Sequence, residues 1–230
     1  MSARYRDAQV GGCVEATVEQ RADGAVIVRS TEALRWFPDR LTDCLQQWAT
    51  EVPDRVFAAR RDAGGDWRTI TYGQMLQRVQ AVGQALVDLD LSVDRPVAIL
   101  SGNDLEHLTL ALAAMWVGVP CVPVSTAYSL VSQDHGKLRH ILGVTTPGLV
   151  FASGPEYARA IAATVPADTP VVLTAGTLED RPVRRFDELL ATEPGPLLVD
   201  AHLRVGPDTI AKFLFTSGST KAPKGVITTH

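Results

Sequence analysis

The sequence predicts an α/β protein in which helices cover both faces of a mainly parallel β-sheet. Short runs of consecutive apolar residues alternate along the chain with longer segments in which apolar residues recur every three or four positions. The short runs are typical of strands buried on both faces, and the recurring pattern is typical of amphipathic helices. Strands that alternate with helices form βαβ units, which bind ligands at the carboxyl ends of their strands.

Residues 1–37 are expected to form an N-terminal leader that contains a β-hairpin. A strand at residues 25–28 follows an Asp23-Gly24 turn, and residues 14–18 offer the partner strand. Residues 38–230 are expected to form the larger unit.

The larger unit begins with a helix that opens at Pro38 and ends before Pro53. A second hairpin pairs residues 56–59 with 67–70, and Thr71 caps the helix that follows. The apolar stripe of that helix is made of Met75, Val79, Val82, Leu86 and Leu89. Strands are then expected at residues 97–100, 121–124, 148–151 and 170–173, and helices at 105–118, from Ser132 onward, and at 156–164.

Prolines and polar residues dominate residues 179–208. This composition predicts a surface excursion with one short helix, residues 186–191, before the chain returns to the core at Ile210.

Composition excludes several classes of protein. The net charge is −4 and the basic residues are scattered, which argues against a nucleic-acid partner. Cys13, Cys44 and Cys121 lack the spacing of a zinc site or a disulfide framework, so we expect reduced thiols in the cytoplasm. The longest apolar stretch, residues 108–119, is too short to span a bilayer, so no membrane partner is expected.

The most informative residues follow the apolar run at 210–215. Residues 216–225 read Thr-Ser-Gly-Ser-Thr-Lys-Ala-Pro-Lys-Gly. Hydroxyl groups, glycines and lysines directly after a strand are typical of an anion-binding loop, because small residues let backbone N–H groups approach an oxyanion. No register of this stretch gives the spacing of a Walker phosphate loop. We call residues 216–225 the phosphate-loop segment.

The phosphate-loop segment resembles the signature Thr-Ser-Gly-Ser-Thr-Gly-x-Pro-Lys-Gly of the adenylate-forming enzymes, the acyl-CoA synthetase and luciferase superfamily. The chain departs from it at Lys221, where the family has glycine. This lysine either adds a cation for phosphate or, if its φ is positive, deforms the loop. Residues 67–72 and 118–128 are similar to two structural landmarks that precede the loop in the same superfamily.

Within the superfamily, residues 128–134 and 137–140 look most like feruloyl-CoA synthases. The resemblance implies a ligase that joins a small carboxylic acid, ferulate or a related hydroxycinnamate, to coenzyme A. In the presence of Mg²⁺, ATP and the acid would form an acyl-adenylate and pyrophosphate. The coenzyme A thiol would then displace AMP and form the thioester. It also implies that the chain is the incomplete N-terminal part of the large adenylate-forming domain. The chain alone would then be inactive and would need a missing C-terminal fragment.

The resemblance places the nucleotide contacts in the phosphate-loop segment. The predicted contact residues are Thr216, Ser217, Gly218, Ser219, Thr220, Lys221, Lys224 and Gly225. Their hydroxyl and N–H groups and the Lys224 ammonium would neutralise the departing pyrophosphate, while Gly218 and Gly225 would let the backbone fold around phosphate. We assign no catalytic and no metal-binding residue, because the family's remaining motifs follow this loop.

Two alternatives stay open. The chain could be a non-catalytic nucleotide-binding remnant, or part of another acyl- or aryl-CoA synthetase. The histidines do not decide between them: His107, His135, His140 and His202 lack metal-ligand spacing and are expected on the surface or on helix faces. His230 is expected to be solvated rather than catalytic.

Overall fold

The computed structural model describes residues 15–62, 64–216 and 222–230. The chain divides into two compact units, residues 1–37 and 38–230. In the first unit, β1 (Ala16–Gln20) pairs antiparallel with β2 (Val26–Ser30), which confirms the predicted hairpin. Gly24 has a φ of +86° in the connecting turn, a conformation that glycine adopts without steric cost.

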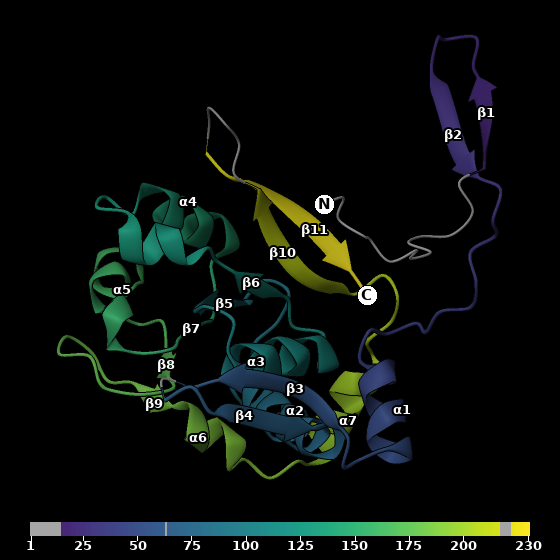
Figure 1. The fold of residues 1–230 in the computed structure, drawn as a ribbon. Helices are drawn as coiled ribbons and strands as arrows, with labels where there is room; N and C mark the ends of the chain where they lie inside the picture. Colours follow the sequence, from purple (N-terminus) through teal and green to yellow (C-terminus); the bar gives the residue numbers. More distant parts are fainter. Residues whose placement is uncertain (1–14, 63, 217–221) are drawn as a thin grey trace, which may run out of the picture. The chain divides into compact units, whose positions relative to one another are not determined.

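The second unit is built on a seven-stranded sheet with the order β11-β10-β6-β5-β7-β8-β9 (Figure 1). All neighbours are parallel except β10 and β11, which are antiparallel. The strands are β5 (Val97–Leu100), β6 (Cys121–Pro123), β7 (Leu149–Ala152), β8 (Val171–Leu173), β9 (Arg184–Arg185), β10 (Ile210–Thr216) and β11 (Lys224–Thr229). The mainly parallel sheet confirms the predicted fold class.

Helices cover both faces of the sheet, and alternate residues of β5 show which helices lie on which face (Figure 1). Val97 and Ile99 belong to one buried cluster, whereas Ala98 and Leu100 belong to the other. The first cluster includes residues of α2 (Tyr72–Asp88) and α3 (Leu105–Trp116), and the second includes residues of α4 (Gly136–Thr145) and α5 (Ala158–Thr164). The strands are buried on both faces because side chains alternate along a strand.

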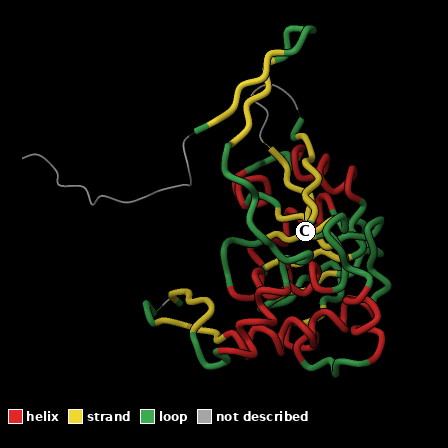
Figure 2. The backbone as a smooth tube through the Cα atoms, turned by 90° about the vertical axis from the view of Figure 1, so that its right-hand side faces the viewer, coloured by secondary structure: helices red, strands yellow, loops and turns green. Residues whose placement is uncertain are grey.

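The second hairpin and its helix also form as predicted. β3 (Val56–Arg61) pairs with β4 (Trp67–Thr71), and the tip of this hairpin projects beyond the helices (Figure 2). Thr71 closes a capping box at the start of α2: its Oγ1 accepts from the Gln74 amide at 3.3 Å, and the Gln74 side chain accepts from the Thr71 amide at 3.0 Å. Two N–H groups of the first turn are thereby paired.

The prediction for residues 179–208 is confirmed in its one short helix, because α6 (Phe186–Leu190) forms there. It is wrong that the rest is a surface excursion: a second helix, α7 (Pro196–Leu203), also forms, and Leu189 and Leu198 of the two helices belong to the core. Pro196 begins α7 because a helix needs no N–H donor in its first turn. The Gly195 amide just before it donates to the Gln84 side chain of α2 at 2.9 Å.

Two helix starts also differ from the prediction. α1 (Asp43–Glu51) begins five residues after Pro38. A π-helical turn, η1 (Ala127–Val131), precedes α4, and α4 begins at Gly136 rather than near Ser132. The Ser132 Oγ instead accepts from the His135 amide at 3.1 Å, and thus stabilises the turn before the helix. A short 3₁₀ turn, η2 (Pro155–Tyr157), likewise precedes α5. Within the described ranges, no helix has the length and apolarity needed to cross a bilayer.

Candidate phosphate-binding site

The β10–β11 hairpin brings the two ends of the phosphate-loop segment together. β10 runs parallel to β6 and ends at Thr216, and β11 begins at Lys224 and returns alongside it. Thr216 and Lys224 are paired across the hairpin, and the Thr216 Oγ1 donates to the Lys224 carbonyl oxygen at 3.5 Å. The chain therefore leaves the sheet at Thr216 and rejoins it at the paired residue Lys224, at the carboxyl end of a parallel strand.

Three of the eight predicted contact residues are described, namely Thr216, Lys224 and Gly225, and all three are exposed. Among the described residues, none forms an ion pair with the Lys224 ammonium, which leaves this charge available to an anion. The other five residues, Ser217, Gly218, Ser219, Thr220 and Lys221, lie outside the described residues, so their roles stay predictions.

Gly225 lies close to an aromatic side chain of the neighbouring strand, and its predicted role at phosphate stays a prediction. Its φ is not among the positive values of the chain, so the backbone here is ordinary strand. A Cβ at this position would lie 3.3 Å from Cζ of Phe215, the residue paired with it on β10. Glycine thus allows the Phe215 ring to lie close against β11.

Pro223 fixes the end of the segment that leads into β11. Its side chain is buried, although the neighbouring residues Ala222 and Lys224 are exposed. Nε2 of His140, on α4, lies 3.0 Å from the Pro223 carbonyl oxygen. Because a carbonyl can only accept, the imidazole must donate from Nε2. A contact between residues 83 positions apart therefore joins α4 to the phosphate-loop segment.

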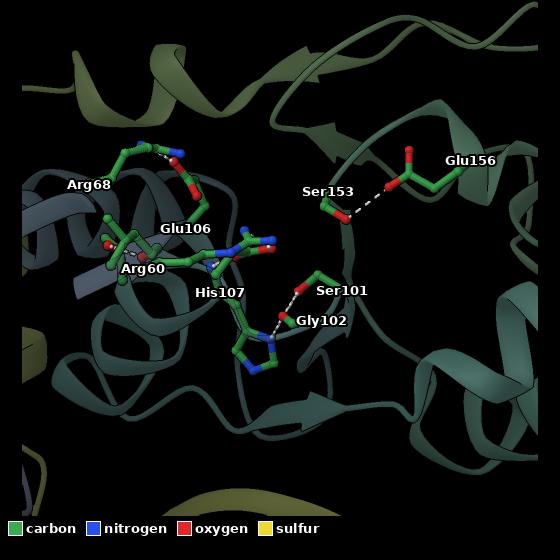
Figure 3. A network of polar contacts seen from close by, with 11 residues as sticks. Arg60, Arg68, Ser101, Gly102, Glu106, His107, Ser153 and Glu156 are labelled. Carbon is green, nitrogen blue, oxygen red and sulfur yellow. Dashed lines mark hydrogen bonds and ion pairs between the residues drawn. The ribbon is translucent and has the colours of Figure 1, made fainter. Parts of the chain in front are cut away.

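A second group of polar residues lies at the carboxyl ends of β5 and β7, where the order of the strands reverses (Figure 3). At the end of β5, the His107 Nδ1 lies 2.9 Å from the Ser101 Oγ and 3.2 Å from the Gly102 carbonyl oxygen. At the end of β7, the Ser153 Oγ donates to Glu156 at 3.1 Å. None of these residues was predicted from the sequence to belong to a binding or catalytic site.

Ion pairs link this group to the β3–β4 hairpin. Arg68 donates to the Glu106 carboxylate at 2.9 Å, and this partner raises the pKa of the arginine. Arg60 lies 3.9 Å from Asp104, whose other oxygen caps α3 through the His107 amide (Figure 3). Burial raises the pKa of the Asp104 carboxyl. A cleft of about 460 Å³ is lined by Arg60, Asp104 and His107 among others, and its one carboxylate, Asp104, already has partners.

His107, His140 and His202 lie on helices, as predicted, whereas His135 and His230 differ from the prediction. His135 is only 3% exposed and has a φ of +51°, at the start of α4. The His202 ring stacks on Trp116 with 3.9 Å between centroids, and burial lowers its pKa. His230 is not fully solvated: its Nδ1 accepts from the Leu41 amide at 3.1 Å, and burial lowers its pKa. Within the described ranges, no three side chains of metal-ligating type converge.

Residues 45–230 match the family described as "AMP-binding enzyme". A luciferin 4-monooxygenase of Nipponoluciola cruciata is 26% identical over 70% of this chain, and a salicylyl-CoA synthase / salicylate adenylyltransferase of Streptomyces sp. is 29% identical over 88%. The matched part is 29% of the first protein and 36% of the second, so the chain spans about a third of their length.

The fold of the chain is also found among solved structures. A fatty acyl-adenylate ligase from L. pneumophila, in complex with acyl adenylate and pyrophosphate, matches with a TM-score of 0.59. The match covers 83% of this chain and 30% of that protein, at 20% sequence identity. This similarity supports the fold, since the identity is too low to carry the activity across.

Proposed function

The chain belongs to the AMP-binding enzyme family, and on this premise we propose that it supplies the phosphate-binding part of an ATP-dependent acid–CoA ligase. Residues 38–230 would form the N-terminal part of the adenylate-forming domain, and residues 1–37 its leader. The observation that carries the proposal is the β10–β11 hairpin. It ends β10 at Thr216 and begins β11 at Lys224, whose ammonium has no ion-pair partner among the described residues, and the predicted hydroxyl-bearing residues lie between these two positions in the sequence.

In the proposed reaction, the carboxylate of the acid attacks the α-phosphorus of ATP and pyrophosphate departs. The Lys224 ammonium would stabilise charge on the departing phosphates. The Thr216 hydroxyl, which donates to the Lys224 carbonyl oxygen at 3.5 Å, would have to exchange that acceptor for a phosphate oxygen to do the same. The proposal adds Ser217, Ser219, Thr220 and Lys221 to this set, with Gly218 and Gly225 between them. Each donor aimed at developing charge would lower the barrier by roughly 3 kcal/mol. The thiol of coenzyme A then displaces AMP and forms the thioester.

The described residues do not form a site for Mg²⁺ of their own, because no group of carboxylates converges near the hairpin. Mg²⁺ is commonly held by substrate phosphates with one or two carboxylates, and it keeps several waters. We therefore propose that the phosphates of ATP would hold Mg²⁺, whose charge would offset theirs. No step is assigned to it through residues of this chain.

The substrate proposal is narrower than the family assignment. Ferulate or a related hydroxycinnamate is proposed from residues 128–134 and 137–140, which look like feruloyl-CoA synthases. In the structure these residues form most of η1 and the first turns of α4, beside the hairpin that carries Lys224. We propose a cytoplasmic enzyme that uses small-molecule acid, ATP and coenzyme A.

Two assays test the proposal. Isothermal calorimetry of the purified chain with ATP and Mg²⁺ should give a binding isotherm, with GTP as the control nucleotide; without an isotherm, the phosphate site is wrong. Thioester formation is then measured with ferulate, salicylate or palmitate, with and without the C-terminal part of a related ligase. Binding of ATP without thioester from any acid would favour the non-catalytic alternative, and a thioester from another acid alone would overturn the hydroxycinnamate proposal.

A further inference from the structure

We propose that His140 is a positioning residue, which holds the phosphate-loop segment at Pro223 and thereby places Lys224 for binding to a triphosphate. The inference rests on the proposed function for its role in ATP binding. The contact itself, from the His140 Nε2 to the Pro223 carbonyl oxygen at 3.0 Å, is independent of that function.

The chemistry of proline makes this contact the decisive backbone anchor of the segment. Proline has no N–H, so the carbonyl oxygen is the only backbone polar group that Pro223 offers. Pro223 is buried, and the pairing of β10 with β11 begins only at the next residue, Lys224. A buried carbonyl is costly unless it accepts a hydrogen bond, and His140 supplies the donor.

His140 comes from an element that is itself fixed to the sheet. Leu138 and Ile141, its neighbours on α4, are fully buried in the hydrophobic cluster that also contains residues of β5 and β7. Phe213 and Phe215 of β10 pack against the same cluster. The donor and the strand that leads into the segment are therefore held by one core, so their distance is set by packing rather than by a flexible linker.

The position of Lys224 follows from this anchor. Lys224 is bonded directly to Pro223, and its own carbonyl oxygen accepts from the Thr216 hydroxyl at 3.5 Å. The two hydrogen bonds hold the backbone on either side of the Lys224 Cα, while its side chain stays exposed. Loss of the His140 bond removes the hydrogen bond on the Pro223 side of Lys224, where the pairing of β10 with β11 has not yet begun. ATP must then order this backbone as it binds, which lowers affinity.

The experiment compares His140→Ala with His140→Gln, whose amide nitrogen can reach the position of the imidazole Nε2 and donate in its place. Val144→Ala is the matched control, because Val144 lies exposed on the same helix. Three quantities are measured on the 230-residue chain: amide hydrogen exchange of peptides covering residues 222–229, ATP affinity by calorimetry, and the His140 tautomer by ¹⁵N NMR.

We expect His140→Ala to speed exchange at residues 222–229 and to weaken ATP binding about fivefold, the equivalent of one neutral hydrogen bond. His140→Gln should restore both, Val144→Ala should change neither, and the wild-type ring should carry its proton on Nε2. The proposal is overturned if exchange is unchanged in His140→Ala, if exchange rises but ATP affinity does not fall, or if His140→Gln fails to restore them.

The design separates this inference from the proposed function. If the wild-type chain binds no ATP, the proposed function fails and the role of His140 in nucleotide binding fails with it. If ATP binds and its affinity is equal in the wild type and His140→Ala, the proposed function stands and the inference alone is wrong.

Discussion

Replacement of Lys224 by methionine tests the proposed phosphate site most directly. Methionine keeps the length and apolar body of the side chain and removes the positive charge. An ammonium about 4 Å from a phosphate gains about 1 kcal/mol in bulk water and about 4 kcal/mol at a typical protein surface. Because Lys224 is exposed, the lower part of this range applies. We expect about 1.5 kcal/mol, which is a loss of about tenfold in ATP affinity.

The assay is calorimetry with ATP and Mg²⁺ at low ionic strength, and Lys137→Met is its control. Lys137 lies exposed on α4, with its ammonium 5.1 Å from the centre of the Tyr128 ring, and its replacement changes the net charge of the protein equally. Lys224→Arg keeps the charge and should retain most of the affinity. The difference between Lys224→Met and wild type should also shrink at about 1 M salt, where the screening length is about 3 Å. Equal losses in Lys224→Met and Lys137→Met, or none in either, would refute the placement of phosphate at this hairpin.

The remaining predictions concern stability and reactivity. Thr71→Ala removes the side-chain oxygen that accepts from the Gln74 amide, while the backbone amide of residue 71 can still donate to Gln74; it should lower the free energy of unfolding in urea by about 1 kcal/mol, whereas Thr71→Ser should restore most of it. Burial lowers the pKa of His202, so the folded state favours the neutral ring; the free energy of unfolding should fall as pH is lowered from about 7.5 to about 5.5, and His202→Gln should flatten this slope. Burial raises the pKa of the Cys121 thiol to about 11, so in a Cys13→Ser background the exposed Cys44 should react with a thiol reagent much faster than Cys121; equal rates would contradict the buried position.

Much of the sheet was predictable because its strands are buried on both faces. Residues 97–100 and 149–152 are apolar throughout, a pattern that only a covered parallel strand requires. α7 was missed because Gly195 and Pro196 read as a loop when no neighbour is known. The packing of α7 against α2 overrides that local signal. The two helices are far apart in the sequence, so local residue patterns do not indicate that they are in contact.

The position of the phosphate-loop segment could be predicted from its residue types. The contacts that hold it in the fold could not be predicted. Hydroxyl, glycine and lysine residues after a strand are a local pattern, and the structure does place their two ends at a strand terminus. The bond from His140 to Pro223 joins positions 83 residues apart, and spacing along the chain says nothing about such a pair. The burial of His135 could not be predicted from spacing either, because it depends on how η1 and the turn before α4 fold, and the stacking of His202 on Trp116 depends on the packing of α7.

The sheet offers two sets of polar residues at strand ends, and their charges explain why the phosphate site is proposed at β10 rather than between β5 and β7. At the β5 end, Asp104 and Glu106 lie beside Arg60 and Arg68, so each arginine already faces a carboxylate. An anion there would have to displace those pairs and approach two negative charges. At the β10 end, the Lys224 ammonium has no acidic partner among the described residues. A triphosphate therefore gains a countercharge there without breaking an existing ion pair.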